Sequence, residues 1–246
     1  MTTPVDPILI AFQRGKINVK GEFVWGSNYT FLAQVEHEGQ TFSAVYKPTR
    51  GERPLWDFPV ASLARREVAT YLVSEALGWR LVPATVYRAK GPIGAGSLQL
   101  FIDHDPEYHY FNLREQDRQR LRPAVLFDVL INNADRKGSH VLIGVDNHIW
   151  LIDHGVCFHV DDKLRTVIWD FVGEPLPAEL CDDIQRFQKN LEPARDGSLS
   201  ELASTLLPYI SREEIFALAD RADALLASGR IPPPSPFRRP YPWPQI

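Results

Sequence analysis

Three polar residues in this sequence have the chemistry that phosphoryl transfer needs. Lys47 ends an apolar, strand-like run, Asp135 lies in a polar loop, and Asp153 follows a second strand-like run. A lysine can contact nucleotide phosphates, one carboxylate can hold Mg²⁺, and a loop carboxylate can orient an acceptor hydroxyl. Because Mg²⁺ keeps several waters, one or two protein carboxylates are enough to bind it. The order of these residues therefore indicates a nucleotide-dependent phosphotransferase.

Further residues could complete such a site. Glu67 falls on an expected helix after Lys47, where its carboxylate could fix the lysine. The turn at Ser27 and Asn28 could present backbone N–H groups to a phosphate. Each feature alone has an ordinary explanation as an exposed helix charge or a simple turn. The hypothesis depends on the ordered set.

The elements that must position these residues begin with a β-rich segment. Residues 29–35 and 41–47 are rich in aromatic and β-branched side chains around a glycine-containing turn, which predicts a hairpin. A helix is expected from about Ser62, with Gly78 as its C-cap. Residues 81–102 return to strand-like composition.

The middle of the chain is predicted to be helical and then to form a second hairpin. An apolar stripe over residues 121–130 indicates a helix, although Asp128 interrupts its apolar run. A polar loop over residues 132–139 follows, and residues 141–143 and 149–152 flank an Asp-Asn turn. This hairpin would bring the two candidate aspartates to one edge.

The C-terminal part is predicted to be helical up to a proline-rich tail. An apolar stripe covers residues 180–191. Two capping boxes mark further helix starts, Ser198 with Glu201 and Ser211 with Glu214. The tail, residues 232–246, is expected to be extended.

Together these elements predict an α+β, two-lobed fold. Residues 1–102 would form a β-rich lobe with one helix, and residues 103–231 a mainly helical lobe with the catalytic loop and the metal-binding hairpin. Residues 232–246 would follow as a separate tail. A nucleotide would lie between the two lobes.

Composition excludes several other classes of protein. The 246 residues include 27 Lys and Arg against 31 Asp and Glu, a net charge of −4, which is unfavourable for nucleic acid. No apolar stretch is long enough to insert into a membrane, and the N-terminus lacks a signal-peptide pattern. Two cysteines cannot build a disulfide framework, so a cytoplasmic location is expected.

Two motifs carry a resemblance to a known family. Residues 135–140 read Asp-Arg-Lys-Gly-Ser-His and residues 153–155 read Asp-His-Gly. They resemble the Asp-Arg-His-x-x-Asn and Asp-Phe-Gly motifs of the phosphatidylinositol 3- and 4-kinase-like branch of the protein-kinase superfamily, which is related to HipA-type bacterial kinases. The sequence is most similar to an actinobacterial kinase-like family, over residues 21–226.

The resemblance implies a two-lobed kinase-like fold that binds ATP with Mg²⁺ or Mn²⁺. Lys47 would be the phosphate-binding lysine, Glu67 its helix partner and Asp153 the main metal ligand. The residues flanking the adenine would be Gln99, Leu100, Phe101 and Ile102.

The sequence departs from the family motifs at two positions. His140 replaces an asparagine, and as a second metal ligand it would favour Mn²⁺. Lys137 replaces a histidine and could steady the transferring phosphoryl group, which leaves Asp135 to orient the acceptor. Basic residues for a lipid head group are sparse, so a protein hydroxyl, including the enzyme's own, is the expected acceptor.

Other functions stay open at this point. A nucleotide-binding pseudokinase and an AMP-transferring enzyme would use the same residues, and a lipid kinase is less favoured. A metal-dependent hydrolase would instead need a cluster built from His140, His154, His159, Asp135 and Asp153.

Overall fold

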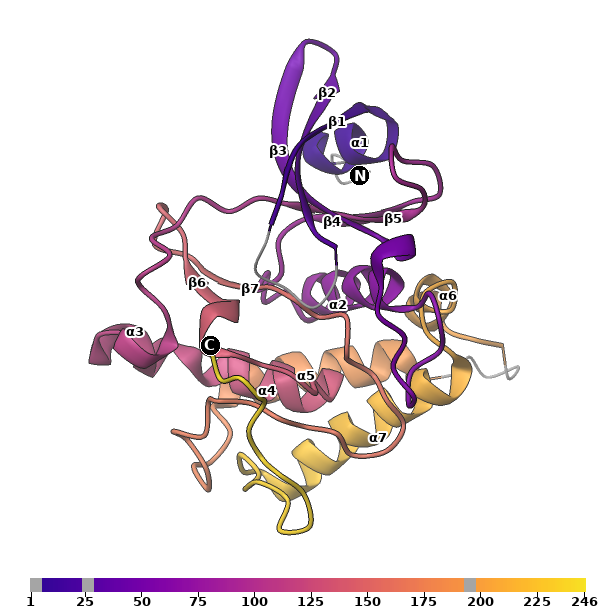
Figure 1. Ribbon diagram of the computed structural model, residues 1–246. Coiled ribbons are helices and arrows are strands. Elements are labelled where there is room, and N and C mark those ends of the chain that lie inside the picture. The colour runs from indigo at the N-terminus through magenta and orange to yellow at the C-terminus, as the bar shows by residue number, and fades with distance from the viewer. Residues whose placement is uncertain (1–5, 24–28, 193–197) are drawn as a thin grey trace.

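A five-stranded antiparallel sheet forms the N-terminal half of the protein (Figure 1). The computed structural model describes residues 6–23, 29–192 and 198–246. The strand order is β1-β2-β3-β5-β4, and the strands are β1 (Lys16–Glu22), β2 (Phe31–His37), β3 (Gln40–Pro48), β4 (Thr85–Arg88) and β5 (Gly96–Leu100). The predicted hairpin is confirmed, since β2 and β3 pair from Phe31 with Tyr46 to His37 with Gln40.

The sheet has one apolar face and one face that lines a cleft. Successive side chains of a strand point to opposite faces. Tyr46 and Ala44 on β3 are buried in a small core with Phe12. Val45 and Lys47, on the same strand, line the cleft on the other side.

Two helices accompany the sheet, where one was predicted. The missed helix is α1 (Pro7–Arg14), which covers the apolar face of the sheet. Asp6 caps it by accepting a hydrogen bond from the Ile8 backbone N–H, and a proline occupies its first turn. A helix of eight residues is too short to show a clear repeat in sequence.

The second helix, α2 (Leu63–Leu77), lies between the sheet and the helical part (Figure 1). Gly78 ends it in the left-handed region with a φ of 78°, as predicted. Arg66 is buried on α2 and donates hydrogen bonds to the Cys157 carbonyl and to the Glu214 carboxylate of the helical part. Helix α2 thus packs into the large core of the C-terminal half. The predicted boundary between the two lobes at residue 102 stays a prediction.

The C-terminal half is mainly helical, with one short hairpin. Its α-helices are α3 (Glu115–Arg118), α4 (Arg122–Ile131), α5 (Ala178–Leu191), α6 (Glu201–Leu206) and α7 (Arg212–Ser228), and its hairpin is β6 (Val141–Ile143) with β7 (Ile149–Leu151). Short 3₁₀ turns are η1 (Thr49–Gly51), η2 (Tyr110–Asn112), η3 (Gln119–Leu121) and η4 (Gly138–His140).

The predicted capping boxes have different outcomes. The Ser211 and Glu214 box is confirmed at the start of α7. The prediction that Ser198 caps a helix is wrong, because Ser200 caps α6 and accepts a hydrogen bond from the Ala203 backbone N–H at 3.1 Å. The serine immediately before the first helical residue has the right geometry for the cap.

The tail returns across the helical part after α7 (Figure 1). Residues 232–246 contain no helix or strand, and turns and bends interrupt the segment, so an extended tail stays a prediction. The Pro240 carbonyl accepts a hydrogen bond from the Thr166 backbone N–H, and the Gln245 carbonyl accepts one from the Gly138 backbone N–H.

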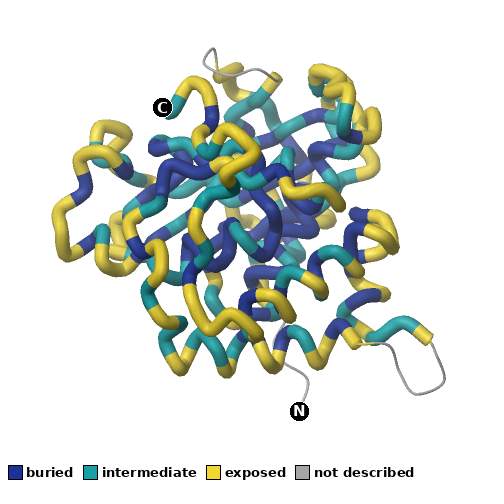
Figure 2. The backbone as a smooth tube through the Cα atoms, turned by 90° about the horizontal axis from the view of Figure 1, so that it is seen from below, coloured by how far each residue is buried: buried dark blue, intermediate teal, exposed yellow. Residues whose placement is uncertain are grey.

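Burial is concentrated in the centre of the helical part, and exposed residues follow its outline (Figure 2). The apolar stripes predicted over residues 121–130 and 180–191 supply buried side chains of α4 and α5 to this core. Within the described ranges, no helix combines the length and the apolar character that crossing a bilayer would require.

Candidate active site

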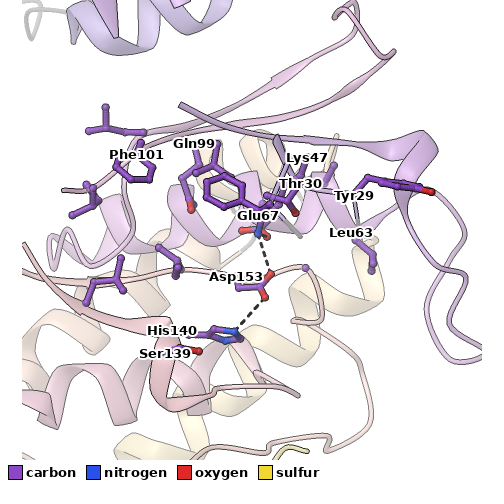
Figure 3. Close-up of a pocket in the computed structure, with 18 of the residues that line it drawn as sticks. Tyr29, Thr30, Lys47, Leu63, Glu67, Gln99, Phe101, Ser139, His140 and Asp153 are labelled. Atoms are coloured by element: carbon purple, nitrogen blue, oxygen red, sulfur yellow. Dashed lines mark hydrogen bonds and ion pairs between the residues drawn. The ribbon is translucent and has the colours of Figure 1, made fainter. Parts of the chain in front are cut away.

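A cleft of about 310 Å³ opens between the sheet, α2 and the hairpin β6–β7. Its volume is in the range of small-molecule sites, about 300–1,000 Å³. Residues drawn from both halves of the chain line it, among them Val45, Lys47, Glu67, Gln99, Leu100, Phe101, Ile102, His140, Leu142, Ile152 and Asp153. Figure 3 shows that the polar side chains gather around Lys47 and Asp153.

Lys47 is the centre of the charged end of the cleft. Its Nζ forms an ion pair with Glu67 Oε1 and another, at 2.9 Å, with Asp153 Oδ1. Burial by itself lowers the pKa of Lys47, but the two carboxylates outweigh burial and raise the pKa above its usual value. The lysine is therefore a permanent cation in the cleft.

Glu67 connects two parts of the site. One carboxylate oxygen pairs with Lys47, and the other accepts a hydrogen bond from the His154 backbone N–H at 3.1 Å. The carboxylate is almost fully buried. Because α2 is anchored in the large core, Glu67 fixes the positions of Lys47 and of the segment that carries Asp153 with respect to that core.

Asp153 follows β7 and presents its carboxylate to the cleft. Its backbone adopts a left-handed conformation with a φ of 60°, which is uncommon for residues other than glycine. Its side chain is 50% exposed, and Oδ2 lies 3.3 Å from His140 Nε2. The Lys47 charge holds the pKa of Asp153 well below its usual value, so the carboxylate stays ionised.

His140 is neutral at pH 7, because burial lowers its pKa to about 4. The Lys137 backbone N–H donates to His140 Nδ1 at 3.4 Å, so in this arrangement Nε2 carries the proton and faces Asp153 Oδ2 at 3.3 Å. The imidazole thus positions the carboxylate. Metal binding at Nε2 would require the other tautomer, and the role of His140 as second ligand stays a prediction.

The donor set fits a divalent ion that is bound partly by nucleotide phosphate. In the part of the chain that the structure describes, no group of three or more His, Cys, Asp and Glu side chains could hold a metal ion. Mg²⁺ does not need such a cage, because it takes waters, phosphate oxygens and one or two carboxylates. Asp153 has an ionised carboxylate in the cleft that could serve as that ligand.

Asp135 and Lys137 lie beside the cleft and do not line it. Lys137 Nζ is 3.5 Å from Asp135 Oδ2. Burial raises the pKa of Asp135 to about 6, although the positive charge of Lys137 opposes this shift. A carboxylate that titrates near neutral pH is suited to accept a proton.

The raised pKa of Asp135 predicts a pH-dependent activity. Below about pH 6 the carboxyl is protonated and cannot accept a proton, so kcat/KM for phosphate transfer should fall about tenfold per pH unit. Above pH 6, Asp135→Asn should lower transfer about a hundredfold, and the difference from the wild type should shrink below pH 6, where the wild type is itself protonated. Initial rates measured from about pH 5 to pH 8 test both expectations, and a flat profile for the wild type would contradict them.

The same shift has a consequence for stability. Because the pKa is higher in the folded protein than in the unfolded chain, the folded state binds the proton more tightly, and stability falls as pH rises from about 4 to about 6. The side chain is 32% exposed, so solvent screening reduces the effect. Above pH 6, Asp135→Asn should therefore raise the free energy of unfolding by about 1 kcal/mol.

A buried ion pair beneath the site was missed in the sequence. The side chains of Arg136 and Asp128 are both fully buried and 2.9 Å apart. Arg136 also donates to the Ile152 carbonyl at 2.9 Å and contacts His154 Nε2 at 2.7 Å. One side chain therefore joins α4, the loop of Asp135 and the segment of Asp153. The sequence feature that could have predicted this ion pair is the charged Asp128 inside an apolar helix, since a buried carboxylate needs a partner.

The structure brings together most of the residues predicted for the site. The following line one cleft: Lys47, Glu67, Gln99, Leu100, Phe101, Ile102, His140 and Asp153. Ser27 and Asn28 lie outside the described residues, so their predicted contact with phosphate stays a prediction. The chemical roles of the residues that line the cleft likewise stay predictions.

The arrangement of sheet, helix, cleft and hairpin defines a protein-kinase-like fold. The structure of the Golgi casein kinase with Mn/ADP bound matches with a TM-score of 0.55 and 15% identity, over 89% of this chain and 74% of that chain. The structure of hydra Fam20 with sugar matches with a TM-score of 0.56 and 14% identity, over 90% of this chain and 86% of that chain. At these identities the similarity shows the fold alone, and the predicted fold class is confirmed.

The chain belongs to the same family as Protein Rv2133c of Mycobacterium tuberculosis, to which it is 41% identical over 94% of this chain and 92% of that protein. Phosphatidylinositol 4-kinase gamma 4 of Oryza sativa subsp. japonica is 28% identical over 47% of this chain and 24% of its own length. No protein-family model matches the chain. The predicted resemblance to an actinobacterial kinase-like family and to phosphatidylinositol kinases is confirmed.

Proposed function

We propose that this protein transfers the γ-phosphoryl group of ATP to a protein hydroxyl, including hydroxyls of its own, with Mg²⁺ or Mn²⁺. The observation that carries the proposal is the pairing of Lys47 with both Glu67 and Asp153 inside one cleft. A lysine fixed by a helix glutamate beside a metal-binding carboxylate is the central arrangement of kinase sites. The fold neighbour with Mn/ADP bound supports nucleotide and metal binding.

The residues would divide the reaction among themselves. Lys47 neutralises phosphate oxygens, and Asp153 holds the divalent ion, which screens the charge of the phosphates when bound. Asp135 would accept the proton of the acceptor hydroxyl while the oxygen of that hydroxyl bonds to the γ-phosphorus. The bond between the γ-phosphorus and the bridging oxygen breaks, and ADP leaves. Lys137, whose Nζ lies 3.5 Å from Asp135 Oδ2, would steady the transferring group.

The apolar end of the cleft would hold the adenine ring. Leu100, Phe101 and Ile102 continue from β5 and line the cleft beside Leu142 and Ile152. The His104 ring nitrogen Nδ1 contacts the Ile102 carbonyl at 2.8 Å. This connector between the two halves would offer a planar base an apolar slot.

The hydrolase alternative receives no support from the geometry. His154 is fully buried against Arg136, and His159 lies 3.9 Å from Asp161. These histidines do not converge with Asp135 and Asp153 into a cluster among the residues the structure describes. The pseudokinase and AMP-transfer alternatives share the cleft and are separated by experiment.

The proposal is tested by incubating the purified protein with ATP and either ion, and by measuring ADP formation and intact mass. The wild type should form ADP and gain phosphate-sized increments, and Lys47→Met should lower both about 10²–10³-fold. Lys90→Met, an exposed lysine after β4, is the matched control and should behave like the wild type. An AMP-sized increment would redirect the assignment to AMP transfer, and no product with either ion would contradict phosphotransfer.

A further inference from the structure

The amide of Gln99 is a buried polar group at the back of the cleft. Gln99 lies on β5 and is 4% exposed, yet its side chain lines the cleft. Figure 3 shows this side chain extending from the strand into the cleft between Phe101 and Lys47. A buried amide has to satisfy both its N–H₂ and its oxygen, so its partners determine what a ligand meets there.

The orientation of this amide is fixed by Thr85. The register of β4 and β5 places Thr85 directly opposite Gln99. The Thr85 hydroxyl donates to the Pro83 carbonyl at 2.7 Å, so its single proton is used and its oxygen accepts from Gln99 Nε2 at 3.0 Å. The amide nitrogen therefore faces Thr85. Among the described residues no donor reaches Gln99 Oε1, which is left as an acceptor for a ligand.

Gln99 lies between the two ends of the cleft. It stands opposite Val45 on β3, and Lys47 lies two residues further toward the charged end. Phe101 and Ile102 follow Gln99 toward the connector. A base held against the connector, with its phosphates at Lys47, would thus present the edge nearest β5 to Gln99 Oε1.

We infer that Gln99 makes the base subsite selective for adenine over bases with an oxygen at purine position 6. This inference rests on the proposed function, because it takes the cleft to bind a purine nucleotide with position 6 of its base toward β5. Adenine has an amino group at this position, which can donate to Gln99 Oε1. Hypoxanthine and guanine have a carbonyl oxygen there, which would place two acceptors against each other with no proton between them.

The amide cannot easily adapt to the wrong base. Rotating it would bring Gln99 Oε1 against Thr85 Oγ1, and the Thr85 proton would have to leave the Pro83 carbonyl. Since Thr85 is 2% exposed, the unpaired group would be buried. Leaving such a group unpaired reduces binding by about tenfold to a hundredfold.

The test compares dissociation constants for ADP and IDP, measured by calorimetry with Mn²⁺ on the full-length chain. IDP lacks the 2-amino group of GDP and differs from ADP only at position 6 and the adjoining ring nitrogen. The wild type should bind ADP about tenfold or more tightly than IDP. Gln99→Leu should lose this preference through weaker binding of ADP.

Thr85→Val gives a second and independent signature. The variant has nearly the same shape but releases the amide, so IDP should bind more tightly while ADP is little changed. Gln40→Leu, at the exposed start of β3, is the matched control. Equal affinity of the wild type for ADP and IDP, or an unchanged preference in a folded Thr85→Val, would overturn the inference.

The outcomes also separate this inference from the proposed function. Selective ADP binding without phosphate transfer would support the role of Gln99 and contradict the phosphotransferase assignment. Phosphate transfer from ATP and ITP at equal rates and affinities would support the phosphotransferase assignment and contradict the role of Gln99. Failure of the wild type to bind either diphosphate would overturn both.

Discussion

Asp153→Asn should lower phosphate transfer about a thousandfold or more, the largest catalytic effect expected from a single substitution. Asparagine keeps the size of the side chain but removes the charge that would hold the divalent ion. It also removes the ion pair with Lys47, which leaves Glu67 as the remaining partner of the lysine. The measurement is the rate of ADP formation and of phosphate-sized mass increments with Mg²⁺ and with Mn²⁺.

The fold should survive this substitution. The Asp153 side chain is half exposed, and Lys47 retains an almost fully buried partner in Glu67. Thermal unfolding should therefore change little between the variant and the wild type. Asp182→Asn, at an exposed position of α5, is the matched control for activity. Wild-type rates in Asp153→Asn would contradict the metal-binding role of Asp153.

Arg136→Met should lower the free energy of unfolding by about 3–5 kcal/mol, the largest effect on stability. Both partners of the Arg136–Asp128 pair are fully buried, so the substitution leaves an uncompensated carboxylate in the core. It also removes the hydrogen bonds from Arg136 to the carbonyls of His140 and Ile152. Urea unfolding followed by circular dichroism measures the loss.

A second substitution separates the charge from the other contacts. Asp128→Asn combined with Arg136→Met removes the stranded charge and should recover part of the stability, because the loss of the carbonyl bonds remains. Arg186→Met, an exposed arginine on α5, serves as control. If the double variant were no more stable than Arg136→Met, burial of the Asp128 charge would not be the cause.

The sequence allowed the elements around the site to be predicted, because each has a local signal. The hairpin of β2 and β3, the Gly78 cap and the Ser211 box depend on neighbouring residues and are confirmed. Lys47, Glu67 and Asp153 were predicted as a set from their order along the chain, and the fold brings them into one cleft.

The remaining features depend on residues that are distant in sequence. The ion pair of Arg136 involves a helix before it and a strand end after it, and only the packed core shows that all three meet. The orientation of Gln99 depends on Thr85, which the β4–β5 register brings opposite. Helix α1 has few residues and no repeat, so its burial against the sheet could not be predicted.

The position of Arg66 on α2 has a consequence for how the protein unfolds. Its guanidinium binds Glu214 and the Cys157 carbonyl in the helical half, while the next residue, Glu67, holds Lys47 of the sheet. Neither half can lose its structure without exposing the side of α2 that the other half covers. Local openings that separate the sheet from the helical part must break these contacts, so we expect both halves to unfold together in one cooperative transition.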